Sequence, residues 1–145
     1  MIIFCLAARP SDLLFLLESD FINLRKYKRI GLCIGGNCLS KFRNRPRMSP
    51  EEVATTISWI EAPLSALGIQ VMICGVTPRG VPRTTGLYED VGRLNSILYN
   101  IYGKKFIGVS ALHMGHISDI DFVHCNKKGS QAFVANVIRD FVHRS

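Results

Sequence analysis

Four short apolar runs, each followed by a segment with helical periodicity, set the strongest limit on how this chain can fold. They cover residues 2–7, 29–34, 70–75 and 105–109. Runs that are apolar almost throughout are typical of strands buried on both faces, and amphipathic helices are the elements that cover such a sheet. The sequence therefore predicts an α/β domain in the order β-α-β-α-β-α-β-α, with a parallel sheet whose ligands bind at the carboxyl ends of its strands.

The predicted helices differ in how clearly they begin and which faces they bury. Ser49-Pro50-Glu51-Glu52 combines a capping serine, a proline at the first helical position and a glutamate at the third, which makes it the surest boundary in the chain. A first helix is expected near Ser11, and Pro63 should kink the second helix or end its regular part. The side chains expected in the core include Trp59, Val91, Leu94, Leu98, Ile101, Phe133, Val134, Val137, Ile138 and Phe141.

Length and composition restrict the class of protein. A chain of 145 residues is expected to form one domain, and its 48% hydrophobic and 20% charged residues exclude an extended disordered chain. The longest apolar runs, such as residues 69–76, are too short to cross a bilayer, and residues 1–8 lack the basic start of a secretion signal. Five cysteines are an odd number, so a disulfide framework is not expected. These features favour an intracellular, cytoplasmic protein.

The formal charge of +7 raises the question of an anionic partner. Part of the excess is concentrated in one segment, with Phe42 as the only aromatic residue among its cations. The cations of this segment are Lys41, Arg43, Arg45 and Arg47. A solvated basic loop accounts for this pattern, and a phosphate-bearing or acidic ligand, nucleic acid included, is the alternative.

Two segments carry the pattern of a catalytic site. Asp121 and His124 lie three residues apart, as a general base and the carboxylate that orients it would. Gly35-Gly36-Asn37 follows the second apolar run, where backbone and amide donors could hold an oxyanion. Both segments are expected at the carboxyl ends of strands, and ester hydrolysis by acyl transfer is the chemistry that such loops would serve.

In their order along the chain, these segments resemble the SGNH or GDSL-type hydrolases. Gly35-Gly36-Asn37-Cys38 is similar to the family block Gly-x-Asn-Asp, and residues 121–124 are similar to the block Asp-x-x-His. Thr77-Pro78-Arg79 and the segment 87–95 resemble connecting segments of family members. The resemblance covers nearly the whole chain and implies a three-layer αβα, flavodoxin-like domain with a small-molecule carboxylic ester as substrate. It implies no cofactor and no metal.

The resemblance also implies roles for individual residues. His124 would be the general base, Asp121 would orient it, and Asn37 would donate to the oxyanion. The loop around the oxyanion would consist of Gly35, Gly36 and Cys38. The Gly-Asp-Ser block, which supplies the nucleophilic serine in the family, is absent from the sequence. We therefore expect a single domain over residues 1–145 that lacks the first β-α unit and is impaired as an esterase. A non-catalytic binding or remnant domain is the alternative.

Other nucleophiles and a metal site are also open to the chain. The candidate nucleophiles are Ser11, Ser110, Cys38 and Cys125, of which the two cysteines lie in the two loops and are expected to be able to approach each other. Helix capping by Ser11 and local hydrogen bonding by Ser110 are the ordinary interpretations. A metal site would draw on His113, His116, Asp119, Asp121, His124 and Cys125. For His113 and His116, a surface loop is the simpler interpretation.

Loss of a first strand would also affect the sheet. In the flavodoxin-like order that strand lies between the second and the third, so its absence would leave unpaired backbone groups on both neighbours. The chain would then have to close the gap itself, self-associate through the unpaired strands, or be marginally stable.

Overall fold

The computed structural model describes residues 2–5, 26–40, 46–80, 86–120 and 124–144. Its sheet contains four parallel strands in the order β1-β2-β3-β4. The strands are β1 (Ile2–Cys5), β2 (Arg29–Cys33), β3 (Gln70–Cys74) and β4 (Phe106–Ile107). All four predicted strands are present, although β4 is shorter than the expected run of residues 105–109. The predicted parallel α/β sheet is confirmed.

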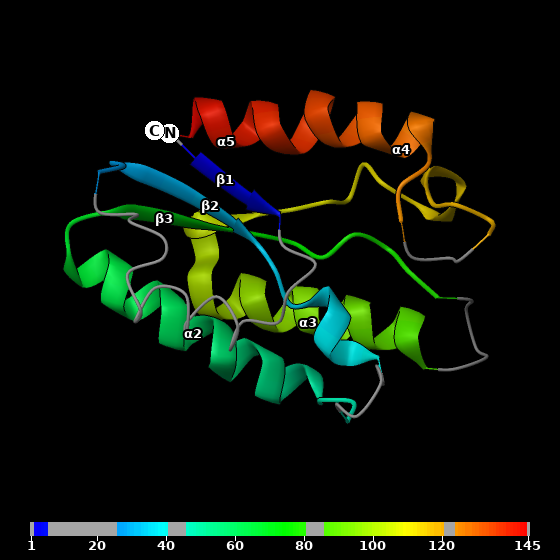
Figure 1. The fold of residues 1–145 in the computed structure, drawn as a ribbon, viewed down its shortest axis with the longest axis horizontal. Coiled ribbons are helices and arrows are strands. Elements are labelled where there is room, and N and C mark those ends of the chain that lie inside the picture. Colours follow the sequence, from blue (N-terminus) through cyan, green and yellow to red (C-terminus); the bar gives the residue numbers. More distant parts are fainter. Residues whose placement is uncertain (1, 6–25, 41–45, 81–85, 121–123, 145) are drawn as a thin grey trace.

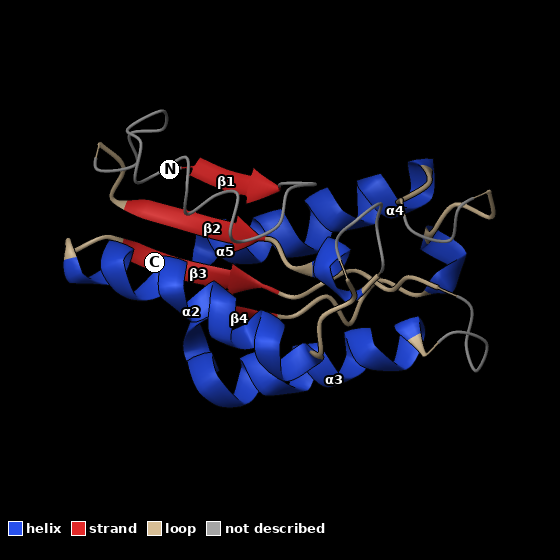
Figure 2. Cartoon of the chain, turned by 60° about the horizontal axis from the view of Figure 1, so that its bottom comes forward, coloured by secondary structure: helices blue, strands red, loops and turns tan. Residues whose placement is uncertain are grey.

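Helices cover both faces of this sheet (Figures 1 and 2). On one face lie α2 (Pro50–Ala66) and α3 (Leu87–Tyr102), which connect β2 to β3 and β3 to β4. Both connections advance across the sheet in the same direction, and right-handed crossovers therefore place both helices on the same face. The other face carries the C-terminal helical run. This run consists of α4 (Lys127–Ala132), the π-helical η4 (Phe133–Ile138) and α5 (Arg139–His143).

The strands supply side chains to a core on each face. Val71 and Ile73 pack with the side chains of α2 and α3, whereas Met72 and Cys74 pack with Val137 and other residues beneath the C-terminal helical run. Because successive side chains of a strand point to opposite faces, a strand between two cores must be apolar at every position. This explains why the runs in the sequence are continuous and not alternating.

The two strands between which a gap was expected, β1 and β2, are directly paired. Ile2, Ile3 and Phe4 of β1 pair in parallel register with Ile30, Gly31 and Leu32 of β2. Direct pairing is thus the outcome, among those expected, that the sheet adopts.

Helix boundaries agree closely with the local signals. The Ser49 hydroxyl accepts a hydrogen bond from the Glu52 backbone N–H at 3.2 Å, and the Glu52 carboxylate accepts one from the Ser49 N–H at 3.3 Å, which confirms the capping box. Pro63 lies inside α2, and the helix ends at Ala66, before Gly68, within the limit expected from this proline. The missing proline N–H falls near the carboxyl end of α2, where its loss interrupts little of the helix. The helix expected near Ser11 lies outside the described residues.

Three of the predicted core positions are exposed. Trp59 is 55% exposed, Ile101 57% and Val134 58%, so the expectation that they are buried was wrong. Each lies at the margin of its helix's apolar stripe, and a helix packed on a sheet buries only the centre of such a stripe. Val91, Leu94, Leu98, Val137 and Phe141 are buried as predicted. In the described part of the chain, no helix is both long and apolar enough to cross a bilayer.

Candidate active site at the carboxyl ends of the strands

The glycine-rich loop after β2 has a backbone that requires glycine. Gly35 has φ of 106°, in the left-handed region, and it precedes the short 3-10 helix η1 (Gly36–Leu39). A Cβ added to Gly35 would lie 2.9 Å from a methyl group of Val53. The Cys38 N–H donates to the Gly35 carbonyl at 3.1 Å and closes the turn. The loop is therefore held in a single tight conformation beneath the amino end of α2.

Arg79, from the segment after β3, lies directly against this loop. A Cβ on Gly36 would be 2.5 Å from the guanidinium carbon, so a larger residue there would displace the arginine from its observed position. Arg79 Nη1 donates to Asn37 Oδ1 at 3.3 Å, and Nη2 donates to Thr77 Oγ1 at 3.5 Å. The sequence placed Arg79 after a strand but carried no signal that it would contact Asn37. That contact depends on two parallel strands ending side by side.

The Arg79 guanidinium is also largely enclosed. Its Nε is buried and has no hydrogen-bond partner in the described residues. Burial lowers the pKa of Arg79, and the nearby Cys125 opposes this shift. An arginine remains charged under such conditions. The Arg79 guanidinium thus contacts the glycine-rich loop and lies within electrostatic range of Cys125.

That second segment is held by a small backbone ladder. Ile117 and Cys125 form an antiparallel bridge, in which the Ser118 N–H donates to the His124 carbonyl at 2.8 Å. The Asn126 side chain accepts from the Gly129 N–H at 2.8 Å and so caps α4. Exposed His124 is thereby presented at the start of the C-terminal helical run. Asp121, its predicted partner, lies outside the described residues.

The sheet separates the two cysteines that were expected to approach each other. Cys38 is fully buried in the core under α2 and α3, whereas Cys125 packs against the core under the C-terminal helical run. The structure therefore brings together Gly35, Gly36, Asn37 and Arg79, with Cys125 beside the arginine. It directs the Cys38 side chain away from this group and into the core.

His113 and His116 use their ring nitrogens within their own turn. Nδ1 of His113 accepts from the Gly115 N–H at 3.0 Å, and Nδ1 of His116 accepts from the His113 N–H at 3.1 Å. Nitrogens that accept these hydrogen bonds are not directed at a shared ligand. Among the residues that the structure describes, no group of three or more potential ligands could hold a metal ion. The surface-loop interpretation fits the observed turn.

This turn should depend on pH. Loss of solvent lowers the pKa of His116, and the charges of His113 and Lys128 lower it further. Because the pKa is lowered in the folded state, the His116 ring binds a proton more tightly when the turn is unfolded. The turn therefore contributes its full stability above pH 6.5. That contribution is lost as the pH falls through the folded-state pKa of His116. We expect NMR titration to show the His116 ring protonating below the usual histidine range, together with loss of the His113 amide hydrogen bond. An unshifted His116 titration would contradict this.

Comparisons with known proteins add evidence at the level of fold. No protein-family model and no curated protein matches the sequence. A Bacteroides fragilis protein assigned as an acylhydrolase matches with a TM-score of 0.73 and 14% identity, over 93% of this chain and 70% of that one. A catalytic serine-to-alanine mutant of an acetylxylan esterase from Geobacillus stearothermophilus matches with a TM-score of 0.70 and 14% identity, over 92% and 68% of the two chains. The chain therefore shares its fold with these two hydrolases. At this identity the likeness extends to the fold alone.

Proposed function

We propose that this chain is an SGNH hydrolase-type domain that binds small carboxylic esters but is impaired in hydrolysing them. The observation that carries the proposal is the contact of Arg79 with Gly36 and Asn37, beside Cys125, in an esterase-like fold. It supports convergence of the two family-like loops at the edge of the sheet where α/β proteins bind ligands. The family roles are carried over to His124 as base, Asp121 as its orienter and Asn37 as oxyanion donor.

The hydrogen bond from Arg79 gives Asn37 a defined orientation. A carboxamide has one accepting oxygen and one donating nitrogen. The guanidinium donates to Oδ1 at 3.3 Å and so fixes the accepting end of the side chain toward Arg79, while Nδ2 is the end with the chemistry to donate to a developing oxyanion. Arg79 would thus be a positioning residue for Asn37.

The missing serine is the reason to propose impaired chemistry. Removal of the nucleophile from a serine hydrolase costs on the order of a millionfold in turnover. In the described structure, Cys38 is fully buried and Ser110 is an exposed loop residue after β4, and neither has the environment of an activated nucleophile. Absence of the first β-α unit is part of the same proposal. The strand order β1-β2-β3-β4 supports it, because this is the order that remains when the first strand is removed from the flavodoxin-like order 2-1-3-4-5.

The test is hydrolysis of a short-chain aryl acetate by the protein and by its His124→Ala variant. We expect equal rates, because a general base without a nucleophile gives little acceleration. Circular dichroism must show that both proteins are folded. A rate well above background that disappears in the variant would contradict impairment, and Ser11→Ala, Ser110→Ala, Cys38→Ala and Cys125→Ala would then identify the nucleophile.

Ester binding needs a separate measurement, since an inactive protein could also lack the site. Acetate, the acyl product, is titrated into labelled protein while amide shifts are followed by NMR. We expect saturable shifts at Gly36 and Asn37 that are lost in Asn37→Ala. Shifts absent from both residues would refute ester recognition at this edge.

The alternative is a non-catalytic domain that contacts an anionic partner such as nucleic acid through residues 41–47. Within the described part of that segment, Arg47 forms an ion pair with Asp90. Residues 41–45 lie outside the described residues, so this alternative rests on sequence alone. Self-association and an intracellular location likewise stay predictions.

A further inference from the structure

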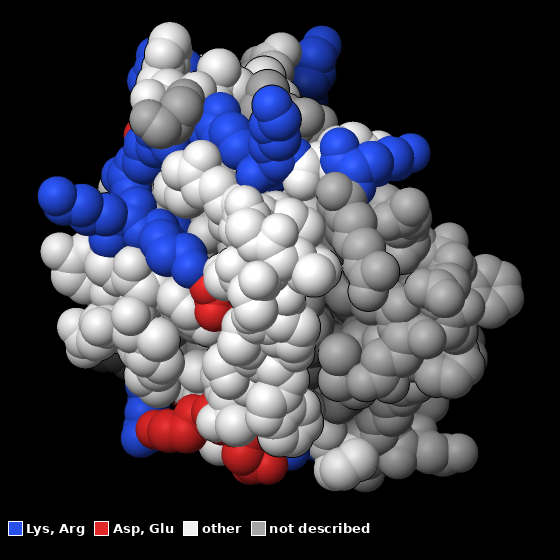
Figure 3. Space-filling model, turned by 90° about the vertical axis from the view of Figure 1, so that its left-hand side faces the viewer, with Lys and Arg blue, Asp and Glu red and all other residues white. Residues whose placement is uncertain are grey.

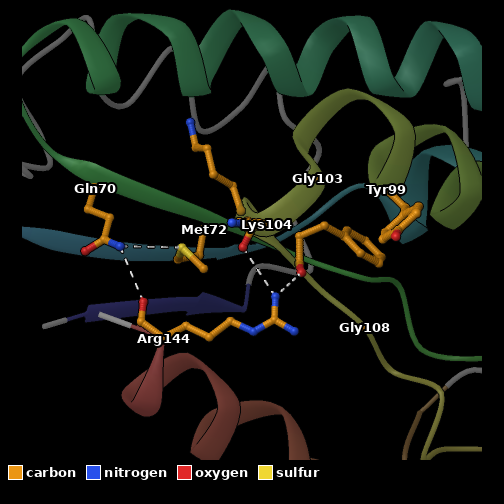
Figure 4. Close-up of a pocket in the computed structure, with 9 residues that line it drawn as sticks. Gln70, Met72, Tyr99, Gly103, Lys104, Gly108 and Arg144 are labelled. Atoms are coloured by element: carbon orange, nitrogen blue, oxygen red, sulfur yellow. Dashed lines mark hydrogen bonds between the residues drawn. The ribbon is translucent and has the colours of Figure 1, made fainter.

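A groove lies at the opposite end of the sheet from the candidate active site, along the free edge of β4. Its volume is about 810 Å³, within the range of small-molecule sites. Gln70 at the start of β3, Lys104 of η2 (Gly103–Lys105) and Arg144 after α5 line it, and Figure 4 shows them around the strand edge. Gln70 and Lys104 lie at the amino ends of the parallel strands β3 and β4, whereas the glycine-rich loop and Arg79 follow the carboxyl ends of β2 and β3.

Arg144 is fixed in the groove with part of its guanidinium unused. Its Nη1 donates to the Phe106 carbonyl at 2.7 Å and to the Lys104 carbonyl at 3.3 Å, and its Nε donates to Asp140 at 3.0 Å. These bonds hold the side chain across the end of β4 (Figure 4). The two N–H groups of Nη2 have no partner in the described structure. A rigidly held guanidinium with two free donors suits an oxyanion such as phosphate.

The two neighbouring lysines differ in the charge that they offer. Lys105 pairs with Glu61, whose pKa is raised by burial but lowered overall by hydrogen bonds from Lys105 and Ser65. Its charge is therefore largely neutralised. The exposed ammonium group of Lys104 has no carboxylate partner among the described residues. Arg144 is itself paired with Asp140, so Lys104 supplies the uncompensated charge and Nη2 of Arg144 supplies hydrogen-bond donors for an anion.

The surface around the groove is also basic. Figure 3 shows Lys and Arg side chains gathered over this end of the molecule. Lys28 and Arg29 adjoin the groove, because the Lys28 carbonyl accepts from the Gln70 N–H at 2.9 Å and Arg29 Nη2 donates to the Arg144 carbonyl at 3.3 Å. Such a face raises the local concentration of anions.

An aromatic wall completes the groove. Tyr99 is 61% exposed and packs edge to face against Phe106, with ring centroids 6.1 Å apart and an interplanar angle of 77°. A tyrosine ring fixed by a neighbour yet open to solvent offers a face on which a planar group can stack. The groove therefore combines anion donors with a stacking surface.

We propose that this groove binds a phosphate group joined to a planar ring, the chemistry of a nucleotide, with Lys104 and Arg144 on the phosphate and Tyr99 against the ring. This site is separate from the ester site proposed above. The same chemistry could come from a free nucleotide or from one unit of a single-stranded RNA.

Binding of ADP by calorimetry, and of a fluorescent oligouridylate by anisotropy, tests the proposal. We expect saturable ADP binding that is about tenfold weaker in Lys104→Gln and in Tyr99→Ser. The matched variants Lys104→Arg and Tyr99→Phe keep the charge and the ring and should bind nearly as well as the parent. Arg93→Gln removes one charge elsewhere, where Arg93 pairs with Glu51, and should have no effect.

The oligonucleotide distinguishes the two sources of the ligand. Displacement of oligouridylate by ADP would show that a strand enters the groove, whereas ADP binding without oligouridylate binding would indicate a free nucleotide. Two results would overturn the proposal: no saturable ADP binding, or equal weakening by Arg93→Gln. Oligouridylate binding that ADP does not displace would place the strand outside the groove and leave a free nucleotide as the ligand. Circular dichroism of each variant excludes loss of folding as the cause.

Discussion

Replacing Gly129 with alanine should destabilise the protein by about 3 kcal/mol or more, because the new methyl group would enter occupied space. A Cβ on Gly129 would lie 2.9 Å from the carbonyl carbon of His116 and closer still to its oxygen. That oxygen cannot move freely, since it accepts from the Asn126 N–H at 3.0 Å. The substitution must therefore separate α4 from the turn before the candidate active site, or shift both.

The matched control for this prediction is Gly92→Ala. Gly92 is exposed in α3, and a Cβ there would meet no atom within 4 Å. Alanine is favoured over glycine inside a helix, so this variant should gain up to about 1 kcal/mol. Urea unfolding followed by circular dichroism gives both free energies. Similar values for the two variants would show that Gly129 is not under the steric restriction described here.

Loss of Arg29 should be the next most damaging change, at about 2–3 kcal/mol in Arg29→Ala. The Arg29 guanidinium donates to the carbonyl oxygens of Phe141, Val142 and Arg144, which end the C-terminal helical run. It also lies 4.9 Å from the centre of the buried Phe141 ring. One side chain of β2 thus satisfies the carbonyl groups that a helix end leaves without partners.

Two variants separate this role from that of charge alone. Arg29→Lys keeps the cation but loses the planar fork, and should recover only part of the stability. Lys28→Ala removes an adjacent exposed cation and should change stability by less than about 0.5 kcal/mol. Hydrogen exchange should show faster opening of residues 139–144 in Arg29→Ala. Unchanged protection there would mean that the helix docks through its apolar side chains alone.

Local features of the fold could be predicted from the sequence because their causes are local. The capping box at Ser49 and Glu52 requires only residues within one turn, and the bounds of α3 follow from a periodicity inside the helix itself. The parallel sheet follows from strands that are apolar on both faces. The margins of the apolar stripes could not be predicted, as exposed Trp59 shows, because burial there depends on where neighbouring elements end.

Only part of the candidate site has a local sequence pattern. The glycine-rich loop and the segment of His124 each form a contiguous pattern that resembles a family block, and their catalytic roles stay predictions. Arg79 is separated from Asn37 by 42 residues, and no local pattern connects them. Cys38 and Cys125, which were expected to be able to approach each other, pack with different cores, and sequence spacing alone does not tell which core a loop thiol joins.

The sequence by itself determined the alternation of buried strands and amphipathic helices, the firm start of α2 and the two family-like loops, because these depend on residue type and short-range periodicity. Only the tertiary structure decided that β1 pairs directly with β2 and that Arg79 lies over Gly36. It also decided that Arg144 crosses the edge of β4. These contacts join residues distant in the chain, and their partners are chosen by how the layers pack as a whole.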